Sequence, residues 1–399
     1  MKKMFIVLMF LLFTPFIYAR ELPVDVTATS VAVIDLDRNE IVLEKNADDE
    51  VVLASLTKMM TAYTVIDKVE NLNKKVTITD KDLYALWGFT QIGLEEGDKV
   101  SYLDLLYGMM LYSGADASQA LVNHISGNNE EFIKLMNEET QNMGLRHTVY
   151  KDSFGRDDGN VSTAREQAYF LKQALDNELY KKIFTTTNKR LSNGIEAVNY
   201  VRSIATFHGL DSDILLGNKP GYTEVAGLLL ASYVNINGTD YGIIVCHSKE
   251  NEYLSTHVLD TYKIIDYLKT QNYSEKTILQ KGLHVKRIAV ENSTINEYVV
   301  TVDKDMKAYL TEEEFENLQY EYHITDMISS TNEIGDNLGY IDILSNGEVI
   351  NTYNVYLKDN IYSLTRESKI IITAVVVLVI FIIAMMAANL SSKPKRRKR

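Results

Sequence analysis

The chain has 399 residues, 46% of them hydrophobic, and a formal net charge of −13 at pH 7. This much apolar material over several hundred positions is enough for core packing alone to hold a folded protein together. The acidic balance argues against binding of nucleic acid or of anionic lipid headgroups through a broad surface.

The first nineteen residues have the pattern of a secretory signal peptide. Lysines at positions 2 and 3 precede an apolar run over 4–17, and Ala19 stands directly before the charged residue Arg20. A short basic start, an apolar stretch and a small residue at its end predict cleavage after Ala19. An uncleaved N-terminal anchor is the alternative, although the apolar run is short for a membrane span.

Residues 20–272 are expected to form one domain, with strands at both ends of the segment and helices between them. Strand patterns lie at 30–35, 40–44, 226–234 and 241–247, and helical patterns lie at 56–69, 102–111, 130–143, 168–175 and 254–268. Thr163 and Glu166 have the spacing of a capping box, and Gly144 favours a left-handed helix end. Asn237 followed by Gly238 predicts a hairpin. We therefore expect one sheet built from distant segments and covered by helices.

Cys246 is the only cysteine of the chain, so no disulfide can form within it. It lies in the apolar run 242–246. A lone cysteine in such a run is more often a small buried hydrophobic residue than a nucleophile. We interpret it as part of the core.

A second, smaller domain rich in β-structure is predicted at 277–362. It follows a polar junction at 271–276, and its strand patterns lie at 286–290, 298–302, 320–324, 338–344 and 349–357. Asn346 and Gly347 predict a hairpin between the last two strands.

The C-terminal end has the pattern of a membrane anchor. Residues 370–388 contain no charge, and as a helix they would be roughly 28 Å long, close to the thickness of a bilayer core. The tail 389–399 carries six basic residues, which predicts that it is cytoplasmic and that everything before Ile370 is extracytoplasmic. When these six charges and those of Lys2 and Lys3 are removed from −13, the exported part carries about −21. Binding of nucleic acid by the tail is the weaker interpretation.

The sequence lacks the motifs of zinc peptidases and of hydrolases with a nucleophile elbow. It contains no His-Glu-x-x-His zinc motif and no Gly-x-Ser-x-Gly elbow. His124 and His147 are interpreted as ordinary surface or packing residues.

Ser55 and Lys58 stand at the start of the first apolar helix. Residues three apart share one helix face, so the hydroxyl and the amine can meet. A serine becomes a good nucleophile when an adjacent base takes its proton, and a lysine becomes such a base when burial or a neighbouring cation lowers its pKa. The spacing alone is weak, because Ser392 and Lys395 repeat it in the tail. The alternative is a helix-capping serine followed by a solvated lysine.

The order of further motifs resembles the low-molecular-mass penicillin-binding proteins, the serine D-alanyl-D-alanine carboxypeptidase family. There a Ser-x-x-Lys follows two strands and precedes a Ser-x-Asn and a Lys-Thr-Gly. The matching segments are 112–117, 152–155, 162–166, 217–223 and, in the second domain, 335–339. The resemblance implies a mixed α/β (α+β) domain with a mostly antiparallel sheet flanked by helices. A small all-β domain and one transmembrane helix are expected to follow it.

The resemblance also implies the chemistry. Ser55 would be the acylated nucleophile, Lys58 its base, and Ser113 the relay that protonates the leaving amine. The substrate would be a peptidoglycan stem peptide ending in D-Ala-D-Ala, β-lactams would trap Ser55, and no metal or cofactor is needed.

Four further residues are implied in substrate binding. Lys219 would attract the substrate carboxylate and lower nearby pKa values. Gly221, Tyr222 and Thr223 would line the cleft, with the backbone N–H groups of Ser55 and Tyr222 as the oxyanion hole.

Two positions depart from the family pattern: Ala115 stands where an asparagine is usual, and Pro220 where a threonine is usual. They keep two alternatives open. One is a non-catalytic or weakly active wall-binding scaffold on the same fold, and the other is a β-lactamase, which the second domain and the span fit poorly. The Pro220 position predicts an edge strand, since proline is tolerated there. We expect Thr223 or Lys249 to replace part of the lost carboxylate contact.

Overall fold

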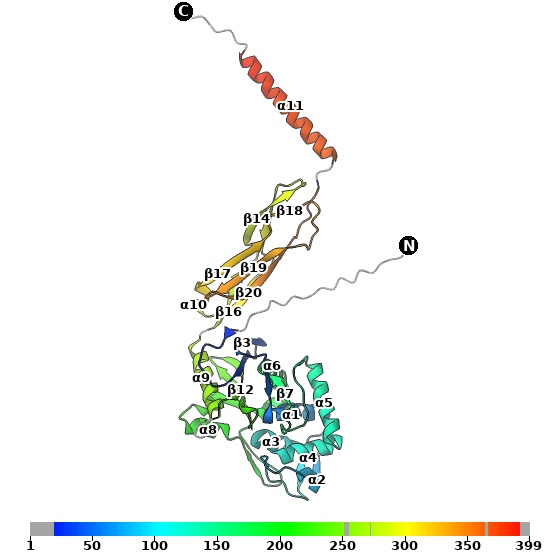
Figure 1. The fold of residues 1–399 in the computed structure, drawn as a ribbon, viewed down its shortest axis with the longest axis vertical. Helices are drawn as coiled ribbons and strands as arrows, with labels where there is room; N and C mark the ends of the chain where they lie inside the picture. Colours follow the sequence, from blue (N-terminus) through cyan, green and yellow to red (C-terminus); the bar gives the residue numbers. More distant parts are fainter. Residues whose placement is uncertain (1–19, 251–254, 272, 364–365, 392–399) are drawn as a thin grey trace, which may run out of the picture. The chain divides into compact units, whose positions relative to one another are not determined.

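The computed structural model describes residues 20–250, 255–271, 273–363 and 366–391 (Figure 1). The contacts divide the chain into two compact units on either side of Tyr273. The predicted signal peptide at 1–19 lies outside the described residues, as do positions 392–399 of the basic tail.

A six-stranded sheet forms the centre of the first unit, in the order β1-β3-β2-β12-β11-β10. Its strands are β1 (Arg20–Glu21), β2 (Ser30–Asp35), β3 (Glu40–Lys45), β10 (Leu215–Thr223), β11 (Gly227–Ile236) and β12 (Thr239–Ser248). All neighbours are antiparallel except β1 and β3. The pairing of β2 with β12 joins segments about two hundred positions apart, so the expected sheet from distant segments is confirmed.

The sheet separates two apolar cores. Side chains of successive strand residues point to opposite faces, so Ile34 of β2 and Ile244 of β12 lie in one core while Val33 and Ile243 lie in the other. Helix α6 packs on the first face and α9 on the second. Cys246 is fully buried in the first core, and burial raises the pKa of its thiol to about 12, as expected of a core residue.

The segment between β3 and β10 is mainly helical. Its helices, with α9 after the sheet, are α1 (Thr57–Lys68), α2 (Asp80–Leu83), α3 (Tyr102–Tyr112), α4 (Ala115–Ser126), α5 (Asn129–Asn142), α6 (Ala164–Leu175), α7 (Glu178–Phe184), α8 (Val201–Phe207) and α9 (Thr256–Thr270). The five predicted helices are present; α2, α4, α7 and α8 were not predicted. Gly144 has the expected left-handed backbone (φ 75°) just beyond α5.

Short elements connect these helices. They are β4 (Glu50–Val52) paired with β7 (Val161–Thr163), β5 (Lys75–Thr77) with β6 (Lys99–Ser101), β8 (Asn188–Arg190) with β9 (Glu196–Val198), and the 3₁₀ turns η1 (Ala54–Leu56) and η2 (Ser212–Ile214). The β4–β7 pair matters most for function, because the chain runs from β4 through η1 directly into α1.

The second unit is β-rich, as predicted. It has three small sheets. The first pairs β13 (Ser274–Leu279) with β16 (Met306–Leu310), and the second joins β14 (His284–Glu291) to β15 (Glu297–Thr301) and β18 (Met327–Ser329). The third joins β19 (Asn337–Ser345) to β17 (Leu318–Ile324) and β20 (Glu348–Tyr356), and the short helix α10 covers Glu312–Glu316. Alternate residues of these strands, such as Ile341 and Ile343, form its own apolar core.

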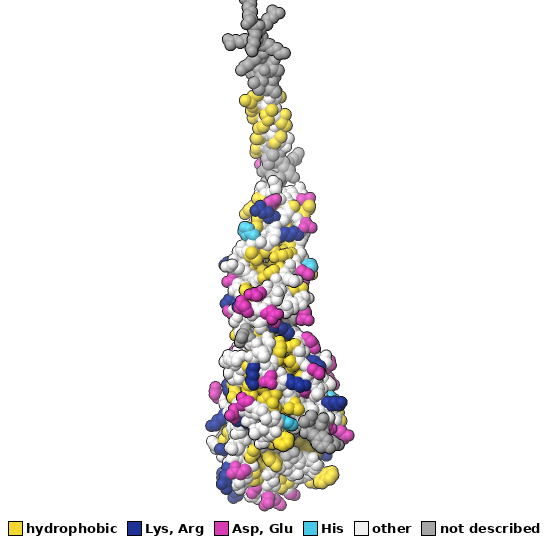
Figure 2. Space-filling view, turned by 90° about the vertical axis from the view of Figure 1, so that its left-hand side faces the viewer, with side chains coloured by type: hydrophobic (Ala, Val, Ile, Leu, Met, Phe, Trp, Pro, Cys, Tyr) yellow, Lys and Arg dark blue, Asp and Glu magenta, His cyan; other side chains and the backbone are white. Residues whose placement is uncertain are grey.

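A last helix, α11, covers Arg366–Ser391. Taken over the part of the chain that the structure describes, no helix is both long enough and apolar enough to cross a membrane. The span predicted at 370–388 is therefore not supported by the structure. Figure 2 shows one face of the molecule, on which acidic and basic side chains are interspersed with exposed apolar ones.

Candidate active site

Ser55 lies in the turn η1 that leads from β4 into α1. Ala54 before it has a left-handed backbone (φ 43°), a conformation that costs energy for a residue with a side chain. The backbone N–H of Leu53 donates to the carbonyl of Asn160 at 2.9 Å, which fixes the approach to the turn. Ser55 itself is only partly buried, so its hydroxyl remains within reach of a ligand.

Lys58 lies one turn further along the same helix face and is 2% exposed. Its Nζ is 3.1 Å from Ser55 Oγ and donates to the carbonyl of Phe154 at 2.6 Å. Burial lowers the pKa of Lys58 to about 7, although the carboxylates of Asp152 and Asp116 act in the opposite direction. A large fraction of this amine is therefore neutral near neutral pH and able to accept the serine proton.

Ser113 and Lys219 form a second pair. Ser113 ends α3 with a left-handed backbone (φ 66°), and Lys219 lies in β10. Lys219 Nζ donates to Ser113 Oγ at 3.0 Å and to the carbonyl of Pro220 at 3.0 Å. The lysine is fully buried, and this burial, followed by the charge of Lys58, holds its pKa well below the usual value.

The two pairs meet because β10 runs against η1. A Cβ placed on Gly221 would lie 3.4 Å from the backbone nitrogens of Ser55 and Leu56. Glycine at this position thus lets the strand approach the serine turn. The structure brings Ser55, Lys58, Ser113, Lys219 and Gly221 together around one small site.

The two remaining predicted site residues mark the end of β10. Tyr222 is 47% exposed, and its hydroxyl donates to the carboxylate of Glu250 at 2.9 Å. The hydroxyl of Thr223 accepts from the N–H of Ala226 at 3.0 Å. Both residues therefore lie at the rim of the site rather than in its centre.

This geometry is that of a serine acyl-transferase, and comparison with known proteins agrees with it. Residues 18–249 match the sequence profile of D-alanyl-D-alanine carboxypeptidases, over more than half of the chain. The chain belongs to the D-alanyl-D-alanine carboxypeptidase family. Residues 273–363 match the C-terminal domain of penicillin-binding protein 5. The chain is thus a low-molecular-mass penicillin-binding protein of the serine carboxypeptidase type.

Individual relatives match the chain over different lengths. D-alanyl-D-alanine carboxypeptidase DacF of Bacillus subtilis is 27% identical over 345 residues, which cover 84% of this chain and 85% of that protein. DacC of Escherichia coli is 34% identical over 236 residues, 55% of this chain and 57% of that protein. Among solved structures, carboxypeptidase DacD of Francisella tularensis superposes with a TM-score of 0.69 at 18% identity, covering 86% of this chain and 96% of that one. The last comparison shows that the fold is shared.

The first departure from the carboxypeptidase pattern, Ala115, is accommodated by apolar packing. Its side chain is 1% exposed and belongs to a cluster with Leu86 and Phe154, against which Phe89 packs. Its backbone N–H donates to the carbonyl of Thr90 at 2.8 Å. The position that carries an amide in the family is therefore filled here by a small apolar core.

The second departure, Pro220, lies on a sheet edge. β10 is the last strand of the six, and Pro220 is opposite Leu230 of β11. Proline lacks a backbone donor, which an edge strand tolerates. The predicted edge position is confirmed.

Two carboxylates that the sequence did not assign hold the surroundings of the base in place. Asp152 accepts from the N–H groups of Phe154 and Gly155 at 2.7 Å each, and so orders the loop whose carbonyl contacts Lys58. Asp116 is fully buried and accepts from three successive N–H groups of the 92–94 segment at 3.0–3.1 Å. The motifs contained both residues, but only their long-range contacts reveal the role.

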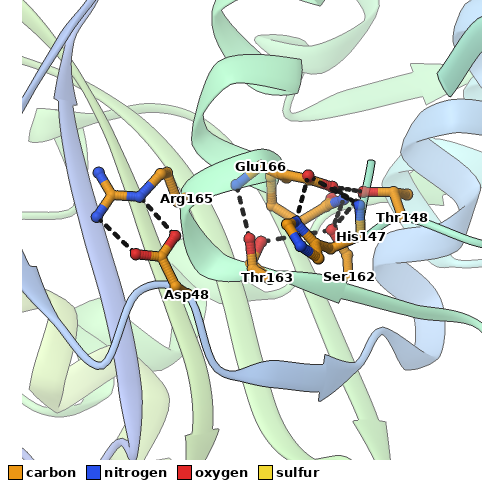
Figure 3. Close-up of polar contacts among 8 residues, drawn as sticks. Asp48, His147, Thr148, Ser162, Thr163, Arg165 and Glu166 are labelled. Atoms are coloured by element: carbon orange, nitrogen blue, oxygen red, sulfur yellow. Dashed lines mark hydrogen bonds and ion pairs between the residues drawn. The ribbon is translucent and has the colours of Figure 1, made fainter. Parts of the chain in front are cut away.

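Glu166 corrects the predicted capping box (Figure 3), whereas His147 lies on the surface as expected, with 72% of its side chain exposed. The N–H of Glu166 donates to Thr163 Oγ1 at 3.1 Å, which is one half of the expected capping box. Its carboxylate instead accepts from the N–H of His147 at 2.9 Å and from the hydroxyl of Thr148 at 2.5 Å, because the 147–148 segment lies alongside. Thr148 in turn contacts Ser162 Oγ at 2.7 Å. His147 is thus part of a polar cluster that holds β7, the partner of β4, in place.

Proposed function

We propose that the chain removes the terminal D-alanine of stem peptides through an acyl-enzyme on Ser55. The hydroxyl oxygen attacks the carbonyl carbon of the penultimate D-alanine while Lys58 takes the hydroxyl proton. The peptide bond then breaks, the terminal D-alanine leaves, and water later releases the shortened peptide from the serine. The 3.1 Å contact between Lys58 and Ser55, with a lysine pKa of about 7, is the observation that carries this proposal.

Ser113 and Lys219 are proposed to serve the leaving group and the substrate carboxylate. Their 3.0 Å contact gives the nitrogen of the departing D-alanine a route to a proton. The N–H groups of Ser55 and Tyr222 are proposed as the oxyanion hole, supported by the close approach of Gly221 to the serine turn. Lys219 is fully buried and the oxyanion donors belong to the backbone, so these groups need little reorganisation during the reaction.

The carboxylate of the substrate is proposed to gain contacts at the end of β10. Thr223 has an accepting contact from Ala226, which leaves its hydroxyl proton available to a ligand. Lys249 follows β12 directly, is exposed, and is held by its N–H to the hydroxyl of Thr27 at 3.2 Å. A carboxypeptidase assay in which Thr223→Val and Lys249→Ala both behave as wild type would remove this part of the proposal.

Release of D-alanine from a synthetic pentapeptide tests the main proposal. Wild type is expected to release it and Ser55→Ala is not, whereas equal release by both proteins would contradict a role for Ser55. A scaffold without activity, which the family membership does not favour, would release none. The lifetime of a bound fluorescent penicillin separates a carboxypeptidase from a β-lactamase, because a β-lactamase sheds the label quickly.

We further propose that the protein is exported and held at the cell membrane with its catalytic unit on the extracytoplasmic face. The sequence supports this through the N-terminal pattern and through the uncharged run 370–388 before a basic tail. Cell fractionation tests it: the protein should stay in the membrane pellet after an alkaline wash, and a form ending at residue 363 should not. A wash that extracts the whole chain would contradict the anchor.

A further inference from the structure

A cavity of about 560 Å³ lies behind the loop that contacts the catalytic lysine. Its walls come from α2, the chain after α2, α4, the start of α5 and the loop 152–156. This volume falls within the range of sites that take a small ligand. The proposed reaction does not use this cavity.

The charges of the cavity wall balance. Its acidic residues are Asp80 and Asp152, and its basic residues are Lys81 and Arg156. Asp152 is already saturated by backbone N–H groups, and Lys81 Nζ donates to the carbonyl of Gly127 at 2.5 Å. A strongly anionic or cationic ligand gains little net attraction from such a wall. The charge pattern therefore favours a neutral ligand.

Side-chain amides supply much of the remaining polar wall. Gln119, Asn123, Asn128 and Asn129 all line the cavity. The Gln119 amide nitrogen donates to two backbone carbonyls of the 81–84 segment at 3.0 Å each, so this side is held in place without a ligand. An amide presents both donors and acceptors, which matches a ligand rich in hydroxyl and acetamido groups.

An exposed aromatic side chain is part of the same wall. Tyr84 lines the cavity and is 76% exposed. Exposed large aromatic groups beside a polar cavity are typical of binding sites, since their flat faces cover the apolar face of a ligand ring. Neutral charge, amides and an aromatic face together fit a sugar.

The cavity is also close to the reacting serine. Phe154 lines it, and the Phe154 carbonyl is joined to Ser55 Oγ through Lys58 by contacts of 2.6 and 3.1 Å. A stem peptide of four residues spans roughly 13 Å when extended, which is longer than this path of two contacts from the Phe154 carbonyl to the serine. We propose that this cavity is a subsite for the N-acetylated amino-sugar backbone of the glycan to which the stem peptide is attached. The proposal rests on the proposed function, because it assumes the same polymer as substrate.

Kinetics with two substrates test the subsite. One is the free pentapeptide and the other is the same peptide on its N-acetylated disaccharide. We expect a KM at least about fivefold lower for the disaccharide form in wild type. Tyr84→Ala and Gln119→Ala should each reduce that difference while leaving turnover of the free pentapeptide unchanged. Phe207→Ala, an aromatic that is 83% exposed and not part of the cavity wall, is the matched control and should keep the difference.

Equal KM values for the two substrates in wild type would overturn the subsite, as would a difference that survives in both cavity variants. A binding measurement without peptide separates this outcome from failure of the proposed function. Isothermal titration calorimetry should give a binding signal with a trimer of β-linked N-acetylglucosamine and none with a trimer of glucose. The absence of a binding signal with both sugars would also overturn the subsite, whether or not D-alanine is released.

Discussion

Gly155 packs directly on the carbonyl of Ala54, the residue before the nucleophile. A Cβ added to Gly155 would lie 1.8 Å from that oxygen, and Gly155 has a left-handed backbone (φ 90°). Glycine is the one residue that meets both demands without strain. The loop 152–157 therefore holds the serine turn from one side while its Phe154 carbonyl holds Lys58 from the other.

Gly155→Ala should displace Ser55 and lower the rate of acylation by penicillin by roughly tenfold or more, because small misplacements of reacting groups are costly. The rate is measured by stopping the acylation of the purified variant by penicillin at successive times and determining the fraction acylated. Gly97→Ala is the matched control: its backbone is also left-handed (φ 92°), but no atom lies within 4 Å of the added Cβ. It should acylate like wild type, and equal losses in both variants would contradict the contact as the cause.

The pH dependence of acylation should follow Lys58. Its pKa is lowered to about 7, so the amine is protonated below pH 7 and unable to accept the serine proton. The acylation rate should therefore rise with pH through about 7 and then level off. Lys58→Arg, whose guanidinium stays charged, should be inactive over the whole range. A wild-type rate that is flat between pH 5 and 9 would rule out Lys58 as the base.

The free energy of unfolding should also depend on the ionisation of Lys58. The pKa of Lys58 falls from 10.5 in the unfolded chain to about 7 in the folded one, so between these values the unfolded state binds more protons. The free energy of unfolding of wild type should then increase with pH from about 7 to 10, relative to Lys58→Met, and the difference should be constant below pH 6. Urea titrations at several pH values measure it, and a difference that does not change with pH would contradict the burial of a neutral amine.

The two departures from the family pattern should respond differently to reversal. Pro220→Thr restores a hydroxyl on an edge strand next to Lys219, and one added hydrogen bond is worth roughly 2- to 150-fold in kcat/KM for the peptide. Ala115→Asn instead places an amide among Leu86 and Phe154, and overpacking costs about 1–3 kcal/mol of stability. Steady-state kinetics and thermal denaturation of both variants give the test. A gain in activity from Ala115→Asn alone would contradict the packing argument.

Glu166 should matter more for stability than the neighbouring ion pair in Figure 3. Glu166→Gln weakens charge-assisted contacts to the 147–148 segment and should cost about 1–3 kcal/mol. Asp48→Asn removes an ion pair with Arg165 whose acidic partner is 73% exposed, which should cost about 0–1 kcal/mol. Denaturant titration compares the two variants, and an equal or larger loss for Asp48→Asn would be the contrary result.

Local patterns predicted much of the fold. The Ser55–Lys58 spacing and the strand periodicities follow from geometry within one element, and the motif order then indicated the family. Helix α4 escaped prediction because its buried face is largely alanine, as at Ala117 and Ala120, and gives a weak apolar signal.

The long-range contacts could not be predicted from periodicity. Ser113 and Lys219 are 106 positions apart, and the motif resemblance alone suggested that they belong to one site. Asp152 and Asp116 act through backbone N–H groups, which any sequence supplies, so neither partner leaves a signature in the residues. The use of Glu166 for the 147–148 segment likewise depends on tertiary packing that competes with its local capping role.

The identity of the nucleophile is tested most directly by the mass of the intact protein after exposure to benzylpenicillin, followed by mapping of the modified peptide. One added penicillin is expected, located on Ser55 and absent from Ser55→Ala. An unmodified wild type, or a label on any other residue, would contradict it.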